Sequence, residues 1–170
     1  GGDAEVLTGV FTRVERLGAA GKILAATRAA QANRHTLSGH RSPAEWLAAR
    51  TGVSLAEAKD TLALGEDLSA LPGVDEALRA GDLTPKRATM ITTAVKQNPA
   101  KERALINGAG TDNHKQFAER CLRAAAQGRS AQDEEARTRA IHANRQCRTW
   151  TDVDGYHLFA RLTPAVGAQV

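Results

Sequence analysis

Proline, glycine and helix-capping residues divide most of this chain into short segments, and this division limits the folds it can adopt. Ser42-Pro43 followed by Glu45 is the pattern of a helix N-terminus, because serine caps free amides and proline suits the first helical position. Ser54 repeats the capping signal, and Thr84-Pro85 opens a further segment. Breaks are predicted at Gly52, Leu71-Pro72-Gly73, Gly81, Asn98-Pro99 and Gly108-Ala109-Gly110.

The segments between these breaks have the composition of helices. Alanine, the residue with the best helix propensity, is very common, and aromatic residues make up only 4% of the chain. Hydrophobic residues make up 42% of the 170 residues, which is enough for the core of one domain. We therefore predict a mainly α fold, a multi-helix domain with seven or eight helices. The expected helices cover residues 3–33, 43–51, 54–70, 74–80, 85–97, 100–107, 113–127 and 130–144.

The first expected helix, residues 3–33, is the longest. Gly18 and Gly21 either bend it or allow another helix to pack closely against it. Residues 34–42 are polar and contain glycine, so a loop is expected after it. The helix is predicted from apolar residues that recur at helical spacing: Val6, Leu7, Val10, Val14, Leu17 and Leu24.

The pattern changes after residue 145, where two β-rich runs flank Asp154-Gly155, a dipeptide that favours a hairpin turn. One face of the second strand would carry Leu158, Ala160 and Leu162. A hairpin alone is marginal, so it must pack on the helices, pair with another chain or belong to sequence beyond Val170. We expect residues 1–145 to form the helical domain, and 146–170 to form the hairpin and the start of a truncated element packed on that domain.

Residues 42–62 have the form of a helix-turn-helix, in which small residues such as Gly52 and Ala58 allow two helices to cross closely. A recognition helix offers Arg, Lys, Asn or Gln to the edges of bases. The second helix here begins instead with a net acidic set: Glu57, Lys59 and Asp60. We therefore favour a packed helical hairpin over insertion of this helix into a DNA groove.

Cationic residues elsewhere are better candidates for contact with DNA. The net charge is +4, residues 114–148 carry more Arg and Lys than Asp and Glu, and smaller basic clusters occur in residues 34–41 and at Lys86-Arg87. Such residues hold phosphates without reading sequence, although a solvated helix face has the same composition. The DNA-binding candidates are Arg34, Arg41, Lys86, Arg87, Lys115, Arg120, Arg123, Arg129, Arg137 and Arg145.

Patterns for other kinds of site are missing from the sequence. None of the five histidines belongs to a compact ligand set, so we predict no metal site, and no nucleophile or phosphate-loop motif indicates a catalytic residue. Trp46 and Trp150 either stack on bases or anchor packing, and we favour packing. Cys121 is expected in the core, on an alanine-rich helix.

The number of cysteines and the length of the apolar runs bear on the cellular location of the protein. Two isolated cysteines indicate a reducing interior rather than a disulfide framework, and we expect a cytoplasmic protein. No apolar run reaches the ~20 residues of a membrane span, so no membrane partner is predicted.

Residues 42–91 and 150–170 together resemble a known family. The motifs are Trp46-Leu47-Ala48 before Thr51-Gly52, the Leu71-Pro72 break, Ala80-Gly81-Asp82-Leu83 before a helix, and the tail WTDVDGYHLFARLTPAVGAQV. They are similar to the actinobacterial domain of unknown function 222, also called the 13E12 repeat family, over roughly residues 6–170. Members of that family usually carry an HNH endonuclease domain after this region.

The resemblance implies that the parent protein is a metal-dependent nuclease whose divalent metal lies in a following domain. No cofactor is expected in this chain itself, which has no HNH arrangement of histidines and asparagine. We expect a non-catalytic N-terminal module that binds DNA or positions the substrate for an HNH-type endonuclease. The alternative is a protein–protein interaction module, a possible homodimer that regulates the nuclease through its alanine-rich helices or its hairpin edge.

Overall fold

The helices begin at the residues whose side chains cap them, as the sequence predicts. In the computed structural model, which describes residues 2–162, the Ser42 hydroxyl accepts the Glu45 amide at 3.2 Å and begins the helix at Pro43. The Ser54 and Thr84 hydroxyls cap the next helices in the same way. Gly52 ends a helix with φ of +74°, a left-handed conformation that favours glycine.

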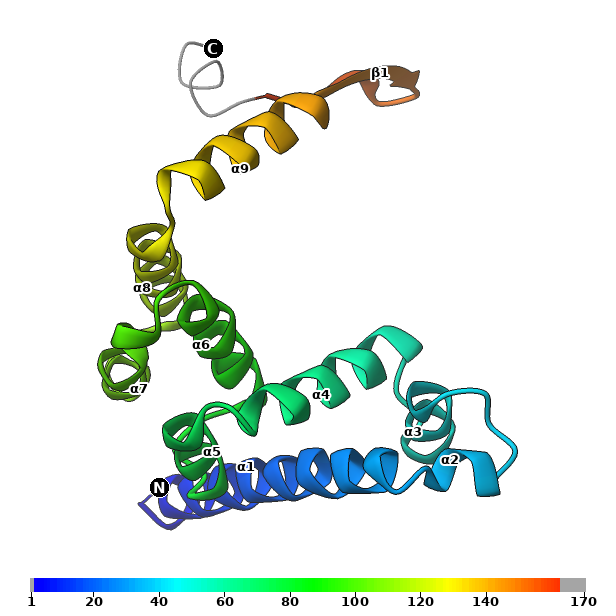
Figure 1. Cartoon of the computed structure of the whole chain (residues 1–170), viewed down its shortest axis with the longest axis vertical. Helices are drawn as coiled ribbons and strands as arrows, with labels where there is room; N and C mark the ends of the chain where they lie inside the picture. The colour runs from blue at the N-terminus through cyan, green and yellow to red at the C-terminus, as the bar shows by residue number, and fades with distance from the viewer. Residues whose placement is uncertain (1, 163–170) are drawn as a thin grey trace. The chain divides into compact units, whose positions relative to one another are not determined.

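The chain divides into two compact units that meet between Gly128 and Arg129 (Figure 1). The first unit is helical, and the second joins one helix to a two-stranded antiparallel hairpin. The first contains α1 (Gly2–Gln31), α2 (Arg34–Leu37), α3 (Pro43–Thr51), α4 (Leu55–Leu68), α5 (Pro72–Arg79), α6 (Pro85–Gln97), the 3₁₀ turn η1 (Pro99–Lys101), α7 (Glu102–Ala109) and α8 (His114–Gly128). The second contains α9 (Ala131–Ala143), β1 (Gln146–Asp152) and β2 (Gly155–Arg161). The predicted fold class, mainly α with a C-terminal β-hairpin, is confirmed.

The first unit has two clusters of buried side chains. The larger cluster joins α1 and α4 to the later helices, and Phe117 of α8, Ile91 of α6 and Leu78 of α5 are fully buried in it. The smaller cluster packs α3 and α4 against α1, and its members are Ala26, Ala44, Leu47, Ala58 and Leu62. Trp46 packs against the smaller cluster, as expected of a packing residue. The helix-turn-helix segment is therefore a tightly packed helical hairpin.

Helices α6 and α8 lie side by side and run in the same direction. Near their first turns, the Arg87 guanidinium donates to the Asp112 carbonyl at 2.8 Å. At their far ends, the Asn98 side-chain amide donates to the Ala124 carbonyl at 3.1 Å. Because the two starts are joined and the two ends are joined, the N-termini of both helices fall at the same end of the unit.

In the second unit, a capping box formed by Ser130 and Asp133 begins α9. The strands pair with Asp152 opposite Gly155, so the turn falls at Val153-Asp154 and the Asp-Gly hairpin prediction is confirmed. The side chain of Trp150 stacks on His157, with ring centroids 5.0 Å apart, and both faces of the hairpin are largely exposed.

The sequence placed α9 with the helical domain, whereas the structure groups it with the hairpin. The predicted packing of residues 146–170 on the helical domain stays a prediction, and residues 163–170 lie outside the described part.

Two local predictions are wrong. The expected loop 34–42 contains α2, whose single polar turn has no apolar period to reveal it, and this makes nine α-helices among residues 2–162 rather than seven or eight. Helix α5 begins at Pro72, because proline is well suited to a first turn as well as to a break. The predicted first helix is confirmed, and its apolar residues between Val6 and Leu17 are exposed.

Of the two alternatives for Gly18 and Gly21, a close approach of another helix is not found at either glycine and occurs at Gly65. A Cβ at Gly18 or Gly21 would meet no atom within 4 Å, so neither glycine makes room for a neighbour. A Cβ at Gly65 of α4 would collide with the Thr27 hydroxyl and lie 3.3 Å from the Ile23 side chain, both on α1. The absence of a side chain at Gly65 is what lets α1 and α4 approach closely.

Two glycine-to-alanine substitutions test this contact. Gly65→Ala should lower the free energy of unfolding by about 1–3 kcal/mol, because overpacking outweighs the better helix propensity of alanine. Gly18→Ala, in open space within α1, should raise it by about 0.5–1 kcal/mol. Urea denaturation of both variants measures the difference, and a Gly65→Ala protein as stable as Gly18→Ala would contradict the close approach.

Candidate nucleic-acid interface

The first turns of α6 and α8 carry cations and no acidic residue. Helix α6 begins with Pro85, Lys86 and Arg87, and α8 begins with His114 and Lys115. The N-terminus of a helix is the positive end of its dipole, where acidic side chains are stabilising and each cation costs about 0.3–1 kcal/mol. Two adjacent helix starts of this composition form a concentrated positive region.

A pocket of about 420 Å³ lies between these two helix starts. We call it the α6–α8 pocket, and it is lined by Arg16, Asp82, Thr84, Lys86, Arg87, Ala109, Gly110, Asp112 and His114. Lys86 and His114 are exposed, whereas Arg16 and Arg87 are half-buried. The Arg16 guanidinium approaches the Gly81 carbonyl at 3.4 Å, and its Nε is buried with no hydrogen-bond partner among the described residues. The pocket therefore gathers donors from α1, α6 and the start of α8.

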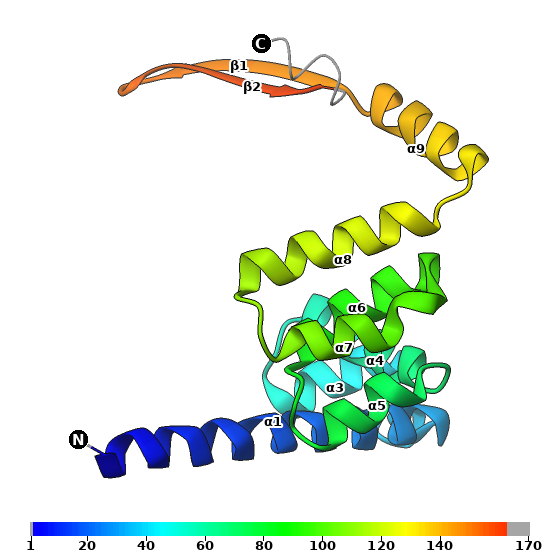
Figure 2. The same cartoon turned by 90° about the vertical axis from the view of Figure 1, so that its left-hand side faces the viewer.

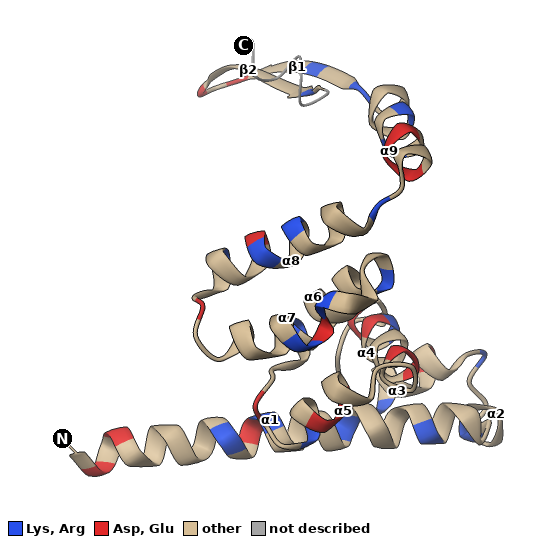
Figure 3. Ribbon diagram, turned by 60° about the vertical axis from the view of Figure 1, so that its left-hand side comes forward, with Lys and Arg blue, Asp and Glu red and all other residues tan. Residues whose placement is uncertain are grey.

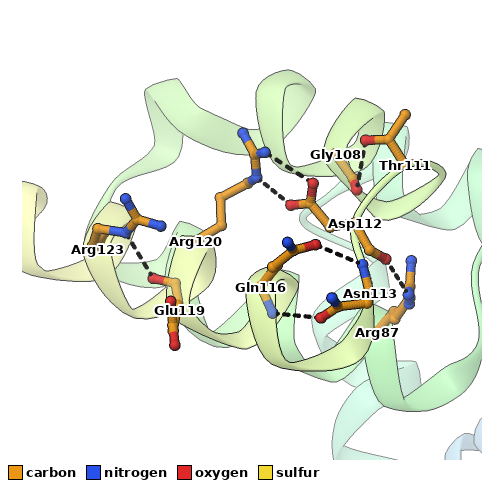
Figure 4. Close-up of polar contacts among 9 residues, drawn as sticks. All are labelled: Arg87, Gly108, Thr111, Asp112, Asn113, Gln116, Glu119, Arg120 and Arg123. Carbon is orange, nitrogen blue, oxygen red and sulfur yellow. Dashed lines mark hydrogen bonds and ion pairs between the residues drawn. The ribbon is translucent and has the colours of Figure 1, made fainter.

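Two acidic residues line the pocket: Asp112 is tied to Arg120 (Figure 4), whereas Asp82 is exposed and offsets part of the positive charge. The Arg120 guanidinium donates to both carboxylate oxygens of Asp112, at 2.6 and 3.0 Å. The Asp112 side chain is only 13% exposed, and the hydrogen bond from Arg120 lowers its pKa below the ordinary value of 3.8. Gly108 permits this arrangement, since a Cβ there would press on the Arg120 side chain at 3.0 Å.

Arg87 is held by the same turn. One of its nitrogens donates to the Asp112 carbonyl (Figure 4). Its guanidinium carbon also lies 5.1 Å from the centroid of the Phe117 ring. Asn113 and Gln116 cap the start of α8 reciprocally, each side chain accepting the backbone amide of the other residue. We call the Arg87–Asp112–Arg120 contacts the Asp112 clasp. It fixes the turn before α8 against the start of α6.

The structure brings together only some of the ten predicted DNA-binding residues. Lys86 and Arg87 line the α6–α8 pocket, and Lys115 is exposed in the neighbouring first turn of α8. Arg34 begins α2 and Arg41 lies between α2 and α3; both are exposed, and neither lines this pocket. Arg123 lies on α8 and donates to the Glu119 carbonyl at 3.4 Å.

Several arginines of the later helices are occupied by carboxylates. Arg120 pairs with Asp112, and Arg129 and Arg137 both pair with Glu134, at 3.1 Å each. Arg145 donates to the His142 carbonyl at 3.0 Å. These arginines keep their formal charge, but a phosphate would have to compete with the partner they already have. The contacts of these arginines therefore do not add support for residues 114–148 as the main DNA-binding segment.

Two side chains of the pocket that can donate to an anion, Arg16 and His114, are not among the residues that the sequence predicts to bind DNA. Arg16 stands some seventy positions before Lys86-Arg87, and helical periodicity gives no indication of which distant segments meet. His114 is one of the five histidines that belong to no compact ligand set in the sequence. The signal that identifies it is the absence of acidic residues from the first turns of two successive long helices, α6 and α8.

Other kinds of site find no support in the described residues. Cys121 is buried, as predicted, and burial raises the pKa of its thiol to about 11, so it is a packing residue rather than a nucleophile. No group of three His, Cys, Asp or Glu side chains within residues 2–162 is placed to hold a metal ion. Over the same residues, no helix has both the length and the apolar character needed to cross a membrane.

No protein-family model, curated protein or solved structure matches the chain. The resemblance to domain of unknown function 222 thus stays a prediction carried by its motifs. Those motifs have structural roles here: Leu47 belongs to the smaller buried cluster, Gly52 caps α3 and Pro72 begins α5.

The Asp112 clasp predicts a specific dependence of stability on pH. Because its folded-state pKa is lowered, the Asp112 carboxylate stabilises the fold above its ordinary pKa of 3.8, and this contribution is lost as pH falls through the folded-state pKa. The difference in melting temperature between the wild type and Asp112→Asn should therefore be constant from about pH 7 to 5 and shrink below about pH 4.

Arg120→Met provides the matched control, because it removes the other half of the ion pair. In the Arg120→Met background, adding Asp112→Asn should alter the pH dependence much less. A full effect of Asp112→Asn without Arg120 would show that the ion pair is not what lowers the carboxyl pKa.

Proposed function

We propose that the first unit binds the sugar–phosphate backbone of DNA at the α6–α8 pocket, as a non-catalytic module that positions substrate for an HNH-type endonuclease. The observation that carries this proposal is the pair of parallel helix starts whose first turns hold Lys86, Arg87 and Lys115 and no carboxylate. A phosphate is the ligand that such a site suits, since helix N-termini and basic side chains both attract it.

The electrostatics favour an anion at this end of α6 and α8. The dipoles of parallel helices add at their shared N-terminal end, and the cations there raise the local potential further. The negative charge of a bound phosphate would offset both the positive ends of the two helix dipoles and the repulsion among the cations there. The exposed side chains of Lys86 and His114 are free to reach a backbone that passes across the mouth of the pocket.

The contacts proposed here hold the backbone and read no base. The helix that would serve for base reading in a helix-turn-helix, α4, exposes Glu57 and Asp60 in its first turns. Carboxylates on that face repel phosphates and weaken the case for insertion into a groove. Affinity should therefore depend strongly on salt and little on sequence.

Catalysis would come from outside these residues. The family resemblance implies that a divalent metal, held by a following nuclease domain, activates water and stabilises the scissile phosphate. The α6–α8 pocket would hold a neighbouring phosphate and fix the register of the duplex. We place this activity in the cytoplasm, where the exposed thiol of Cys147 would stay reduced.

A single charge reversal tests the proposal. Lys86→Glu should weaken binding to a short duplex roughly tenfold and reduce the slope of log affinity against log salt by about 1 or more. Fluorescence anisotropy at two or more salt concentrations measures both quantities. Lys86 is exposed, so the substitution should leave the fold intact.

Lys59→Glu is the control, because it makes the same change of net charge at an exposed position of α4. It should leave affinity within about twofold of the wild type near 0.15 M salt, because Lys59 does not line the α6–α8 pocket and salt screens its remaining effect. Equal losses in both variants would mean that binding follows net charge alone, and unchanged affinity in Lys86→Glu would remove the pocket from the interface.

A further inference from the structure

The first half of α1 exposes a continuous apolar stripe. Figures 2 and 3 show this part of the helix extending beyond the other helices of its unit. Leu7, Val10, Val14 and Leu17 follow the alternating spacing of three and four residues that defines a coiled-coil seam. Val6 and Phe11 widen the stripe, and each of the six is 41–67% exposed.

This seam is covered in its later part and uncovered in its earlier part. Leu24 stands seven residues after Leu17, on the same seam, and packs against the buried core. The side of α1 that enters the core is formed by Ala20, Ile23 and Thr27, which lie on a different face from Val10 and Val14. The stripe from Val6 to Val14 runs for about 13 Å without cover from its own unit, and Leu17 at its end lies beside Gly81.

We infer that this stripe pairs with the same stripe of a second copy, in an antiparallel helix pair. Apolarity alone would accept many partners, but the charges beside the stripe select this one. Asp3 lies on the seam itself, four residues before Leu7, whereas Arg13 flanks the stripe and Lys22 lies near its far end. An antiparallel pair places the acidic end of one helix beside the basic end of the other.

A parallel pair would be disfavoured on two counts. It would place acidic end beside acidic end, and it would align the two helix dipoles. In the antiparallel register, Leu7 packs against Leu17 of the partner subunit, and Val10 packs against Val14 of the partner subunit. The interface is isologous, so it closes on two copies and does not extend into a fibre.

Dimerisation does not rest on the proposed binding of DNA. The stripe and the α6–α8 pocket share no residue, although Arg16 of the pocket follows the stripe on α1. A dimer would present two such pockets to one duplex, which raises the effective concentration of the second contact.

Light scattering after size exclusion tests the dimer. From about 10 µM to about 1 mM protein, the average mass should rise from 18.0 kDa toward twice that value. Val10→Lys should keep the protein monomeric over this range, whereas Thr8→Lys, on the opposite side of α1, should dimerise like the wild type. Both positions are exposed, so neither change removes a core contact. A wild type that stays monomeric, or a dimer that survives Val10→Lys, would overturn the inference.

Cysteine cross-linking tests the direction of the pair. Cys147→Ser removes the exposed thiol and leaves buried Cys121 in place. On air oxidation, a mixture of Leu7→Cys and Leu17→Cys copies should form disulfides mainly between the two kinds of copy. Cross-links mainly between copies of the same kind would show a parallel pair and overturn the proposed geometry.

Discussion

The nucleic-acid interface depends on α6 and α8 lying side by side in the same direction. Parallel helix dipoles repel, so this arrangement needs other interactions to hold it. Phe117 of α8 and Ile91 of α6 are fully buried in one core, and the Asp112 clasp ties the turn before α8 to the start of α6. Because the two starts are held together, Lys86 and Lys115 fall in one region although almost thirty residues separate them. The same contacts that stabilise the fold therefore create the positive end that would attract a phosphate.

Placement of charge matters more here than its total. The net charge of +4 shows only that a polyanionic partner is compatible with the chain. Arg120, Arg129 and Arg137 contribute to that total, yet each is paired with a carboxylate. Lys86 and the first turn of α8 hold fewer charges at a site with no acidic residue in either first turn. A few cations at two helix N-termini are thus better placed to bind phosphate than a larger number along paired helix faces.

The sequence predicts the local structure well because capping and turn formation are local. The Ser42, Ser54 and Thr84 caps and the Asp154-Gly155 turn all lie where the sequence places them. The sequence fails where an outcome depends on which distant segments meet. It identifies a seam along α1 but cannot show that the seam is covered at Leu24 and exposed at Val10. It lists the cations of the interface without showing that Arg16 joins Lys86 at one pocket, or that Asp112 occupies Arg120.

The most direct test of the central claim is to map the DNA-binding surface by NMR. Backbone amide shifts of the ¹⁵N-labelled chain would be followed while a short duplex is added at moderate salt. The largest early shifts should fall on Lys86, Arg87, His114 and Lys115, at the shared start of α6 and α8. Shifts concentrated on the first turns of α4, or on residues 129–145, would show that the duplex is held elsewhere and would contradict this account.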